Sequence, residues 1–593
     1  MTKRCVLPIL LCLLLIGSTS CSLFSSPGPQ DAFRAFAEAL ARKDGGAAAA
    51  STDDRDSASA AITSMFTGMG KDVALKVDVV KPGDDDQNAK LTYSWSWGPN
   101  KTLTYDATAT ATQSGDDWHV HWDTTVLHPK LQPGTTFQYS DDKNFLTPVT
   151  DRDGQPLLTW QTIGVVNLTR EHLDSAPALA ALLQPFDASV TAETITSQFS
   201  ATQDDVVTVI KLRQEDLGGV GDQLKQIAGV SVVEQGALLT ANRELSSPAI
   251  DGLQALWQKA IDDAAGWSVM LVDDKGQPTE QLTSAPPGDT PPLRTTLDIR
   301  LQLLAQQAVA TEPRAAVLVA ISPSTGGILA AAQNAAANAQ GPIAFSGAYP
   351  PGSTFKTITT AAALQAGLAT PTTPEPCPGT VTVENRTIPN EDEFDLGTVP
   401  LSTAFAKSCN TTMAALADKL PADALPNMAR LFGIGVDYVV PGLTTITGRV
   451  PNADTPAQKV ENGIGQGTVT VSPFGLAVAE ASLGHGSTIT PTLVVGETTT
   501  ADTASAPIPP SIASDLRTMM LQTVSDGTAT ALQDVPGLGG KTGTAEFGDN
   551  THSHGWFAGI AGDIAFATLV VGGDTSAPAI TVSGDFLRPA VAG

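Results

Sequence analysis

The chain has 593 residues, with 34 Lys or Arg against 61 Asp or Glu, so its formal net charge is −27 at pH 7. Such an acidic surface repels nucleic-acid phosphates and offers no basic cluster for anionic lipid, which excludes nucleic-acid binding and polybasic membrane binding. The length is about four times that of a typical domain, and the 42% apolar content is enough for several cores. We therefore expect a soluble, acidic protein of several domains.

The first 21 residues have the pattern of an export signal. Lys3 and Arg4 precede an apolar run over residues 5–17, and small residues then lead to Cys21. A helix of that length rises only about 20 Å, too short for a bilayer core of roughly 30 Å, so we predict a signal rather than a span. The small residues before Cys21 resemble a bacterial lipoprotein signal, which implies a signal peptide over 1–21 and lipid on Cys21. The alternative is an ordinary signal with an incidental cysteine.

Beyond the signal, the chain has two cysteines, Cys377 and Cys409. Export places them in an oxidising compartment, where a disulfide between them would close a loop of about 33 residues. Two free thiols are the alternative, because the sequence does not give the distance between the two Cα atoms.

Residues 30–145 are predicted to form a small α+β domain with the shape of a cone. Helical spacing of apolar residues covers 31–43 and 58–69. Alternating apolar and polar residues then predict a series of antiparallel strands. These strands cover 73–80, 89–97, 102–112 and 118–122.

Residues 146–290 are predicted to contain short strands and helices. We find no group of residues there that is typical of a catalytic or binding site. A strand over 206–212 precedes a helix over 217–228, and the Pro-rich segment 284–292 is a stiff linker that ends this region.

From residue 291 onward the sequence predicts one domain whose sheet takes strands from both of its ends. An amphipathic helix ends near residue 310, and a hairpin follows over 315–321 and 327–332. Residues 564–571 form a late, buried strand.

The first chemical signal is Ser353-Thr354-Phe355-Lys356, just after Pro351-Gly352. Three residues apart on one helical face, Ser353 and Lys356 are within hydrogen-bond reach. A lysine whose pKa is lowered by burial and by a helix N-terminus can remove the proton of a nucleophilic serine. Alone the pattern is weak, and its alternative is a capped helix with a solvated lysine.

The second signal is Lys407-Ser408-Cys409-Asn410. The Ser408 hydroxyl can relay a proton, and the Asn410 amide can hold a substrate amide and orient Lys356. Ser and Asn are also favoured helix N-caps, so this signal too has an ordinary structural explanation.

The third signal is Lys541-Thr542-Gly543-Thr544 after two glycines. On a strand, Thr542 and Thr544 share a face and can hold a carboxylate, while Lys541 can reach a hydroxyl such as that of Ser408. Gly543 leaves bare backbone along which a peptide can lie. A phosphate-binding loop is excluded, because Val535 occupies the position where that motif needs a glycine.

Ser-x-x-Lys, Ser-x-Asn and Lys-Thr-Gly in this order resemble the penicillin-recognising serine acyltransferases, and in particular a class B penicillin-binding protein. The segments 463–467, 519–529 and 554–559 resemble further runs of that family. Residues 118–131 resemble the N-terminal domain of its low-affinity, methicillin-resistance type.

The resemblance implies an α+β multidomain fold. Residues 30–145 would form a nuclear-transport-factor-like domain, and 146–290 a pedestal or dimerisation domain. Residues 291–593 would form the transpeptidase domain, an antiparallel sheet with helices on both faces.

The resemblance also implies a D,D-transpeptidase that cross-links peptidoglycan stem peptides through an acyl-enzyme on Ser353. Lys356 would be the base, Ser408 and Lys541 would pass the proton, and Asn410 would complete the catalytic set. Thr542, Gly543 and Thr544 would bind the substrate. No metal or cofactor is implied, and β-lactams would acylate Ser353.

Two alternatives remain open, a non-catalytic wall scaffold or β-lactam sensor and a D,D-carboxypeptidase. The expected location is the outer face of a bacterial cell membrane, with an N-terminal anchor and an extracytoplasmic catalytic domain. Expected partners are glycosyltransferases or proteins of the divisome or elongasome, and no nucleic acid.

Overall fold

The structure is a computed structural model that describes residues 28–81, 86–548 and 552–592. The chain divides by its contacts into two units. The first comprises residues up to Lys143 together with Ala264–Asp289, and the second comprises Asn144–Asp263 together with Thr290–Gly593. The predicted signal peptide and Cys21 lie outside the described residues. None of the helices in the described ranges is long and apolar enough to cross a bilayer.

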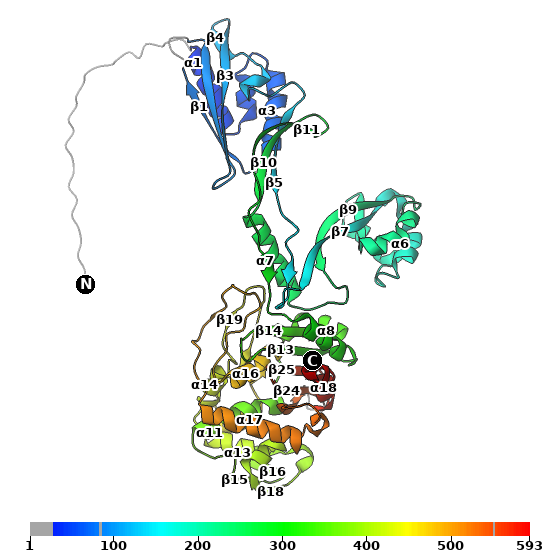
Figure 1. Ribbon diagram of the computed structural model, residues 1–593, viewed down its shortest axis with the longest axis vertical. Helices are drawn as coiled ribbons and strands as arrows, with labels where there is room; N and C mark the ends of the chain where they lie inside the picture. The colour runs from blue at the N-terminus through cyan, green and yellow to red at the C-terminus, as the bar shows by residue number, and fades with distance from the viewer. Residues whose placement is uncertain (1–27, 82–85, 549–551, 593) are drawn as a thin grey trace, which may run out of the picture. The chain divides into compact units, whose positions relative to one another are not determined.

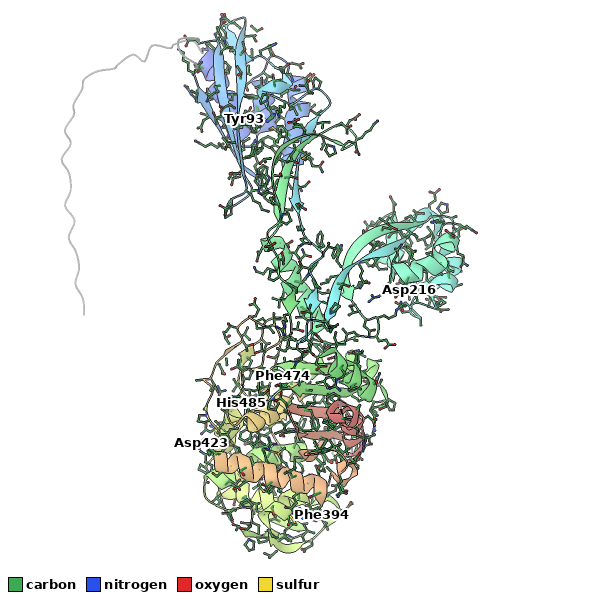
Figure 2. The ribbon with its side chains drawn as sticks, viewed as in Figure 1. Tyr93, Asp216, Phe394, Asp423, Phe474 and His485 are labelled. Carbon is green, nitrogen blue, oxygen red and sulfur yellow. A yellow bond between two sulfur atoms is a disulfide. The ribbon has the colours of Figure 1, made fainter. Side chains whose placement is uncertain are left out.

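The first unit packs helices against a curved antiparallel sheet of four strands, in the order β1-β2-β3-β4 (Figure 1). Every second residue of β2 faces the core, as the alternating sequence predicts. One of them is Tyr93 (Figure 2), which is fully buried and donates its hydroxyl to the carbonyl oxygen of Val126 at 2.8 Å. The elements are α1 (Pro29–Ala41), α2 (Gly45–Ala50), α3 (Arg55–Met69), β1 (Ala74–Val80), β2 (Asn88–Ser96), β3 (Thr102–Ser114), β4 (Asp117–Val120), η1 (Thr124–Val126) and β5 (Thr136–Asp142).

Two later strands, β10 (Gly266–Val272) and β11 (Pro278–Ala285), complete this unit. They form a three-stranded sheet in the order β11-β10-β5, and Trp267, Val269 and Leu271 are buried in the same core as Tyr93. These residues fall within the range 146–290 predicted for the middle domain, because no local pattern signals a strand partner more than a hundred residues earlier in the chain. The division into domains over 30–145, 146–290 and 291–593 remains a prediction.

The second unit begins with a sheet built around one long strand, β7, which pairs with β8 on one side and with β9 on the other. The predicted strand over 206–212 is β8, and the predicted helix after it is α6. The elements are β6 (Val149–Thr150), β7 (Pro156–Thr169), η2 (Arg170–Ser175), α4 (Ala176–Leu183), α5 (Ala192–Ala201), β8 (Val206–Arg213), α6 (Gln214–Leu224), β9 (Val230–Thr240), α7 (Ile250–Asp263) and β12 (Leu293–Arg294).

The rest of the second unit is organised around a five-stranded antiparallel sheet in the order β14-β13-β25-β24-β23. As predicted, its strands come from both ends of this region. The elements before the second motif are α8 (Ile299–Ala310), β13 (Ala316–Ile321), β14 (Ile328–Gln333), α9 (Ala335–Asn338), α10 (Ile343–Ser346), η3 (Gly352–Phe355), α11 (Lys356–Gln365), β15 (Pro374–Cys377), β16 (Thr380–Val383), β17 (Arg386–Pro389), η4 (Glu391–Glu393), β18 (Gly397–Pro400) and α12 (Leu401–Ala406). Those after it are α13 (Asn410–Lys419), α14 (Ala424–Leu431), β19 (Tyr438–Val439), β20 (Gly448–Arg449), α15 (Pro456–Gly463), β21 (Thr470–Val471), α16 (Pro473–His485), β22 (Thr500–Ala501), α17 (Pro510–Ser525), η5 (Thr530–Leu532), β23 (Gly539–Phe547), β24 (His552–Ala561), β25 (Ile564–Val570) and α18 (Ala577–Ala592).

Helices cover both faces of this sheet, which the fully apolar sequence of β13 requires. Ala316, Leu318 and Ala320 pack with α8 and α18 in one core. The alternate residues Val317 and Val319 belong to the other core, which contains α16, α11 and α17. In Figure 1, α17 and α11 run side by side in this region, and their residues are in contact.

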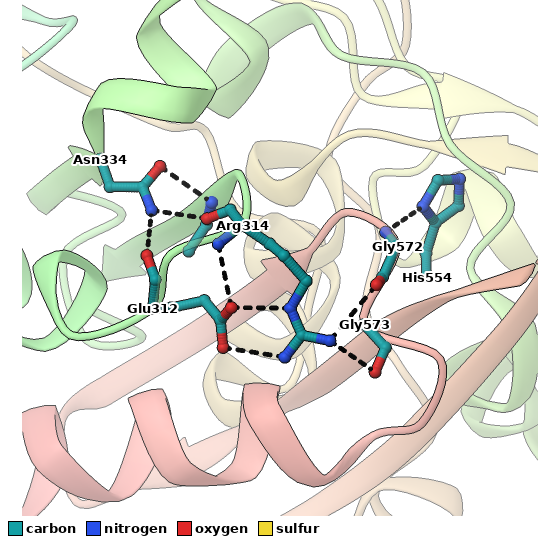
Figure 3. A network of polar contacts seen from close by, with 7 residues as sticks. Glu312, Arg314, Asn334, His554, Gly572 and Gly573 are labelled. Atoms are coloured by element: carbon teal, nitrogen blue, oxygen red, sulfur yellow. Dashed lines mark hydrogen bonds and ion pairs between the residues drawn. The ribbon is translucent and has the colours of Figure 1, made fainter.

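A network of polar groups ties the start of β13 to the loop after β25 (Figure 3). The Arg314 guanidinium binds both oxygens of Glu312, at 2.7 and 3.0 Å, and donates to the carbonyl oxygens of Gly572 and Gly573. The Gly572 N–H donates to Nδ1 of His554 at 3.3 Å. Burial lowers the pKa of His554 to about 4, so its ring is neutral and can accept this bond.

A disulfide joins Cys377, at the end of β15, to Cys409, the residue before α13. The two Cα atoms are 6.1 Å apart, and both cysteines are fully buried. Phe394, labelled in Figure 2, packs against this pair. The bond fixes the β15–β18 sheet to the turn that carries the second motif.

We predict that replacing both cysteines by alanine lowers the free energy of unfolding of the catalytic region by about 3 kcal/mol. The disulfide closes a loop between residues 32 positions apart, so its loss increases the conformational entropy of the unfolded chain. Urea unfolding measures the change. Reductant should destabilise the wild type by a similar amount and leave the double variant unchanged, and an equal effect on both proteins would contradict the prediction.

Candidate active site

The three sequence motifs meet at one cavity of about 710 Å³. Its lining includes Ser353, Ser408, Asn410, Thr542 and Thr544. These residues come from η3, from the turn between α12 and α13, and from β23, the edge strand of the five-stranded sheet. The fold therefore gathers side chains that are far apart in the sequence.

Ser353 lies in the tight turn η3, immediately before α11, and is partly exposed to the cavity. Gly352 has a φ of +52° and donates its N–H to the carbonyl oxygen of Gly465 at 2.9 Å. A Cβ atom on Gly352 would lie 2.4 Å from the carbonyl oxygen of Thr544. Only glycine lets the turn approach β23 this closely, so the glycine fixes Ser353 beside the edge strand.

Lys356 is the first residue of α11 and is fully buried. Its amine donates to Oδ1 of Asn410 at 2.5 Å and to the carbonyl oxygen of Ser408 at 2.7 Å, and it lies 3.2 Å from the Ser408 hydroxyl. The sequence places Ser353 and Lys356 within hydrogen-bond reach, but no hydrogen bond joins these side chains in the parts of the chain that the structure describes. The acceptors from the second motif hold the amine instead.

Burial lowers the pKa of Lys356 well below its usual value of 10.5. The positive charge of Lys541 lowers it further, while Glu391 opposes the shift. Lys356 has no ion-pair partner among the described carboxylates. A buried amine without a counter-ion favours the uncharged form, which is the form that can accept a proton.

Lys541 on β23 is also fully buried, and its amine donates to the Ser408 hydroxyl at 2.9 Å. Burial lowers the pKa of Lys541 to about 7, against a smaller opposing effect of Glu391. Its amine also lies 5.8 Å from the centre of the Phe405 ring. The Ser408 hydroxyl is thus hydrogen-bonded to two buried amines, an arrangement that can move a proton between them.

The backbone at Ser408 has a φ of +62°, in the left-handed region. A residue other than glycine is strained there by about 1 kcal/mol or more. This conformation turns both the carbonyl and the hydroxyl of Ser408 toward Lys356. We take the strain as a sign that the orientation of this turn matters for function.

Asn410 begins α13, and its amide is held at both ends. Its Oδ1 accepts from Lys356, and its Nδ2 donates to the carbonyl oxygen of Pro389 at 2.8 Å. The backbone N–H groups of Asn410 and Thr411 both donate to the side chain of Asn390. Asn390 was not predicted as a site residue. It caps a helix that begins 20 residues later, and no spacing pattern in the sequence signals such a cap.

On β23, Thr542 and Thr544 both face the cavity, and the Thr542 hydroxyl lies 2.6 Å from that of Thr528. A Cβ atom on Gly543 would lie 2.8 Å from the carbonyl oxygen of Pro351. Gly543 therefore serves the close packing of β23 on the Ser353 turn. The strand pairs with β24 on one side, and its other edge borders the cavity.

An ion pair between Arg386 and Glu461 forms part of the cavity wall, with its nearest atoms 2.5 Å apart. The sequence does not signal this pair, because Arg386 lies on β17, far from Glu461 along the chain. Within the described ranges, no three His, Cys, Asp or Glu side chains gather as metal ligands.

Two protein families match this chain. The family described as "Penicillin binding protein transpeptidase domain" matches residues 316–591, which include all three motifs. The family described as "NTF2-like N-terminal transpeptidase domain" matches residues 28–135. These matches confirm the predicted fold class at both ends of the chain.

Three curated relatives are similar in sequence. "Peptidoglycan D,D-transpeptidase PbpA" of Mycobacterium tuberculosis is 33% identical over 334 residues, which cover 47% of this chain and 67% of that protein. "Peptidoglycan D,D-transpeptidase MrdA" of Acinetobacter baumannii is 26% identical over 40% of this chain and 41% of its own length. "Penicillin-binding protein 3" of Bacillus subtilis is 22% identical over 94% of both chains.

Among solved structures, the chain is similar to that of the "Complex between Penicillin-Binding Protein (PBP2) and MreC from Helicobacter pylori". The TM-score is 0.57 at 17% identity, over 77% of this chain and 99% of that one, which indicates a shared fold. Together with the three motifs gathered at one cavity, these matches confirm the resemblance drawn from the sequence: the chain belongs to the penicillin-binding protein transpeptidases, of the class B type.

Proposed function

We propose that this protein is a peptidoglycan D,D-transpeptidase in which Ser353 is the nucleophile. The substrate is a stem peptide that ends in D-Ala-D-Ala, and the product is a peptide cross-link. One observation carries the proposal: two buried lysines share the hydroxyl of Ser408 beside a partly exposed serine in a cavity. The names of the curated relatives and the family match support the same reaction.

In the acylation step, Oγ of Ser353 attacks the carbonyl carbon of the penultimate D-alanine. The proton of the hydroxyl passes to the uncharged amine of Lys356. The backbone N–H groups of Ser353 and Thr544 stabilise the oxyanion. That of Ser353 is among the first N–H groups of a helical turn, which lack partners within the turn, and that of Thr544 belongs to the edge strand β23. A donor of this kind is worth about 3 kcal/mol in comparable sites.

The C–N bond to the terminal D-alanine then breaks, and the leaving nitrogen receives a proton through Ser408 from Lys541. In the second step, an amine of a neighbouring stem peptide attacks the ester. It loses a proton to the same relay, and Ser353 recovers its own. Atoms and charges balance, because one amide bond breaks and another forms. Substrate binding brings Oγ of Ser353 within reach of the Lys356 amine, as catalytic hydrogen bonds often tighten only when the substrate is bound.

Thr542 and Thr544 hold the terminal carboxylate of the donor peptide, and the positive charge of Lys541 lies next to them on β23. The peptide backbone lies along the edge of β23 at Gly543, as an added strand would. A β-lactam places a carboxylate and a reactive amide in the same positions, so it acylates Ser353 and blocks the cavity.

We also propose that the protein is held on the outer face of a bacterial cell membrane by lipid on Cys21, with the catalytic region outside the cytoplasm. The N-terminal, middle and catalytic domains would cover 30–145, 146–290 and 291–593. Glycosyltransferases or proteins of the divisome or elongasome are the expected partners, since cross-linking acts on newly made glycan strands.

The variant Ser353→Ala should lose all covalent labelling by a fluorescent penicillin, because it lacks the attacking oxygen. Gel fluorescence after denaturation measures the labelling. Ser346→Ala is the matched control, since Ser346 is another partly exposed serine outside the cavity lining, and it should label like the wild type. Labelling of a folded Ser353→Ala protein would contradict the proposal.

The rate constant for acylation at low penicillin concentration should fall above a pH of about 7. The buried Lys541 has a pKa of about 7 and loses its positive charge above that pH, when it no longer attracts the carboxylate of the ligand. In Lys541→Arg the side chain at position 541 keeps its positive charge. The acylation rate constant should therefore be lower overall but should not decline with pH below pH 9. Stopped-flow kinetics across pH measures both proteins. The same alkaline decline in both would show that Lys541 is not its cause.

Cys21→Ala should move the protein from the membrane fraction to the soluble fraction of the cells that make it. Loss of the lipid leaves only the weak hold of a signal segment too short to span. Cys12→Ala is the control, because Cys12 is in the same segment but not at the predicted lipid site. Fractionation and immunodetection measure the distribution, and membrane retention of Cys21→Ala would refute the lipid anchor.

A further inference from the structure

Asn390 is a buried residue outside the three motifs. Its side-chain amide forms hydrogen bonds to the backbone at the start of α13 and to the backbone of its own segment, residues 378–394. Its exposed fraction is 2%. Its Oδ1 accepts from the N–H groups of Asn410 at 2.8 Å and Thr411 at 3.1 Å. Its Nδ2 donates to the carbonyl oxygens of Pro378 at 2.9 Å and Phe394 at 2.8 Å.

The N-terminus of α13 depends on Asn390 for its cap. The first N–H groups of a helix have no partner within the helix, and the side chain of the preceding residue usually accepts one of them. Here that residue is Cys409, whose side chain makes no capping hydrogen bond and is part of the disulfide. Asn390 supplies the missing acceptor from another segment.

Asn390 and its neighbour Pro389 together fix how Asn410 faces Lys356. Asn390 holds the backbone of Asn410, and the carbonyl oxygen of Pro389 binds Nδ2 of the Asn410 side chain. With Nδ2 engaged there, only Oδ1 can point at the Lys356 amine, 2.5 Å away. A rotated amide would place Oδ1 against the carbonyl oxygen of Pro389, which is repulsive because both oxygens can only accept.

This orientation determines where Lys356 can accept a proton. An uncharged lysine amine has two N–H groups and one lone pair. The carbonyl oxygen of Ser408 and Oδ1 of Asn410 can only accept, so they take the two N–H groups. The lone pair is left for a hydroxyl donor, which is the Ser408 hydroxyl, 3.2 Å away, in this structure and the Ser353 hydroxyl in the proposed reaction. If Asn410 moved, the amine could rotate and its lone pair would lose this direction.

We propose that Asn390 is a positioning residue for acylation, which acts through Asn410 to hold the amine of Lys356 in the orientation that accepts the proton of Ser353. The inference rests on the proposed function and deepens it. Asn390 does not touch the reacting atoms in this role, so its removal should slow the chemical step and leave ligand binding to Thr542 and Thr544 nearly unchanged.

The charged groups around Lys356 allow a second readout. Lys541 on β23 is the nearby cation, and Glu391, next to Asn390 in the chain, is the nearby anion. Ser408 and Asn410 are neutral. The variant Asn390→Asp keeps an oxygen for both N–H groups of α13 and adds a negative charge beside these groups. That charge favours protonated Lys356, so acylation by Asn390→Asp should require a higher pH.

The chain contains a matched control for the loss of these bonds. Asn334 caps α9 with the same pattern, since its Oδ1 accepts from the N–H groups of Ala316 and Ala337. Its Nδ2 donates to the carbonyl oxygens of Glu312 and Arg314, at 2.7 and 2.6 Å (Figure 3). Asn334→Ala therefore removes the same kinds of hydrogen bond, but away from the three motifs.

The experiment uses the full chain and a fluorescent penicillin, and it separates the dissociation constant of the first complex from the rate constant of acylation. In Asn390→Ala the acylation rate constant should fall by at least about tenfold, while the dissociation constant changes less than about threefold. Complete loss of a general base typically costs about 10²- to 10⁴-fold, and Asn390 acts on the base only indirectly. Asn334→Ala should acylate within about twofold of the wild type at a similar loss of thermal stability. Asn390→Asp should recover part of the rate and shift its pH midpoint upward.

A wild-type acylation rate in folded Asn390→Ala would overturn the inference, as would equal slowing by Asn334→Ala or an effect on the dissociation constant alone. If Asn390→Ala does not fold, Asn390→Asp is the test. An acylation rate constant and a pH midpoint of acylation equal to those of the wild type would overturn the inference. Failure of the wild type itself to be labelled overturns the proposed function, and the inference with it.

Discussion

The active site depends on the burial of two lysine amines around one serine hydroxyl. Lys356 and Lys541 are both inaccessible to solvent, and Ser408 binds both of them. Removing an ammonium group from water without a paired carboxylate is unfavourable, and the molecule avoids it by lowering the pKa. Between pH 7 and 10.5, the unfolded chain therefore binds a proton that folded Lys541, with its pKa of about 7, does not. The free energy of unfolding should rise with pH through this window.

The surrounding fold keeps these amines buried by rigid, close packing. Gly352 and Gly543 let the Ser353 turn approach β23 at distances that a Cβ atom would forbid. On the opposite side, the disulfide at Cys409 and the remote cap from Asn390 hold the strained Ser408 turn. The acidic net charge does not conflict with the proposed binding of a carboxylate, because the Thr542 and Thr544 hydroxyls face the cavity and Lys541 lies next to them on β23.

The sequence predicted the parts of the fold and site that local patterns determine. Periodicity and residue type predict the hairpin β13–β14 and the helical turn that carries Ser353 and Lys356. The three motifs can be read directly from the sequence. Contacts between distant segments could not be predicted. The pairing of β10 with β5, the Arg386–Glu461 ion pair and the cap from Asn390 each join residues that carry no mutual signal. Ser353 and Lys356 are close enough in sequence for a hydrogen bond, but the carbonyl oxygen of Ser408 binds the amine instead, and its direction depends on one backbone angle.

The most direct test of this account is the titration of Lys356 itself. With lysines labelled by ¹³C at Cε, a difference spectrum between the wild type and Lys356→Arg assigns its signal, and the chemical shift is followed against pH. The account predicts a midpoint well below 10.5, so that the amine has lost its proton under the conditions in which it must act as a base. A midpoint at or above 10.5 would mean a permanent cation at position 356, which cannot take the proton of Ser353.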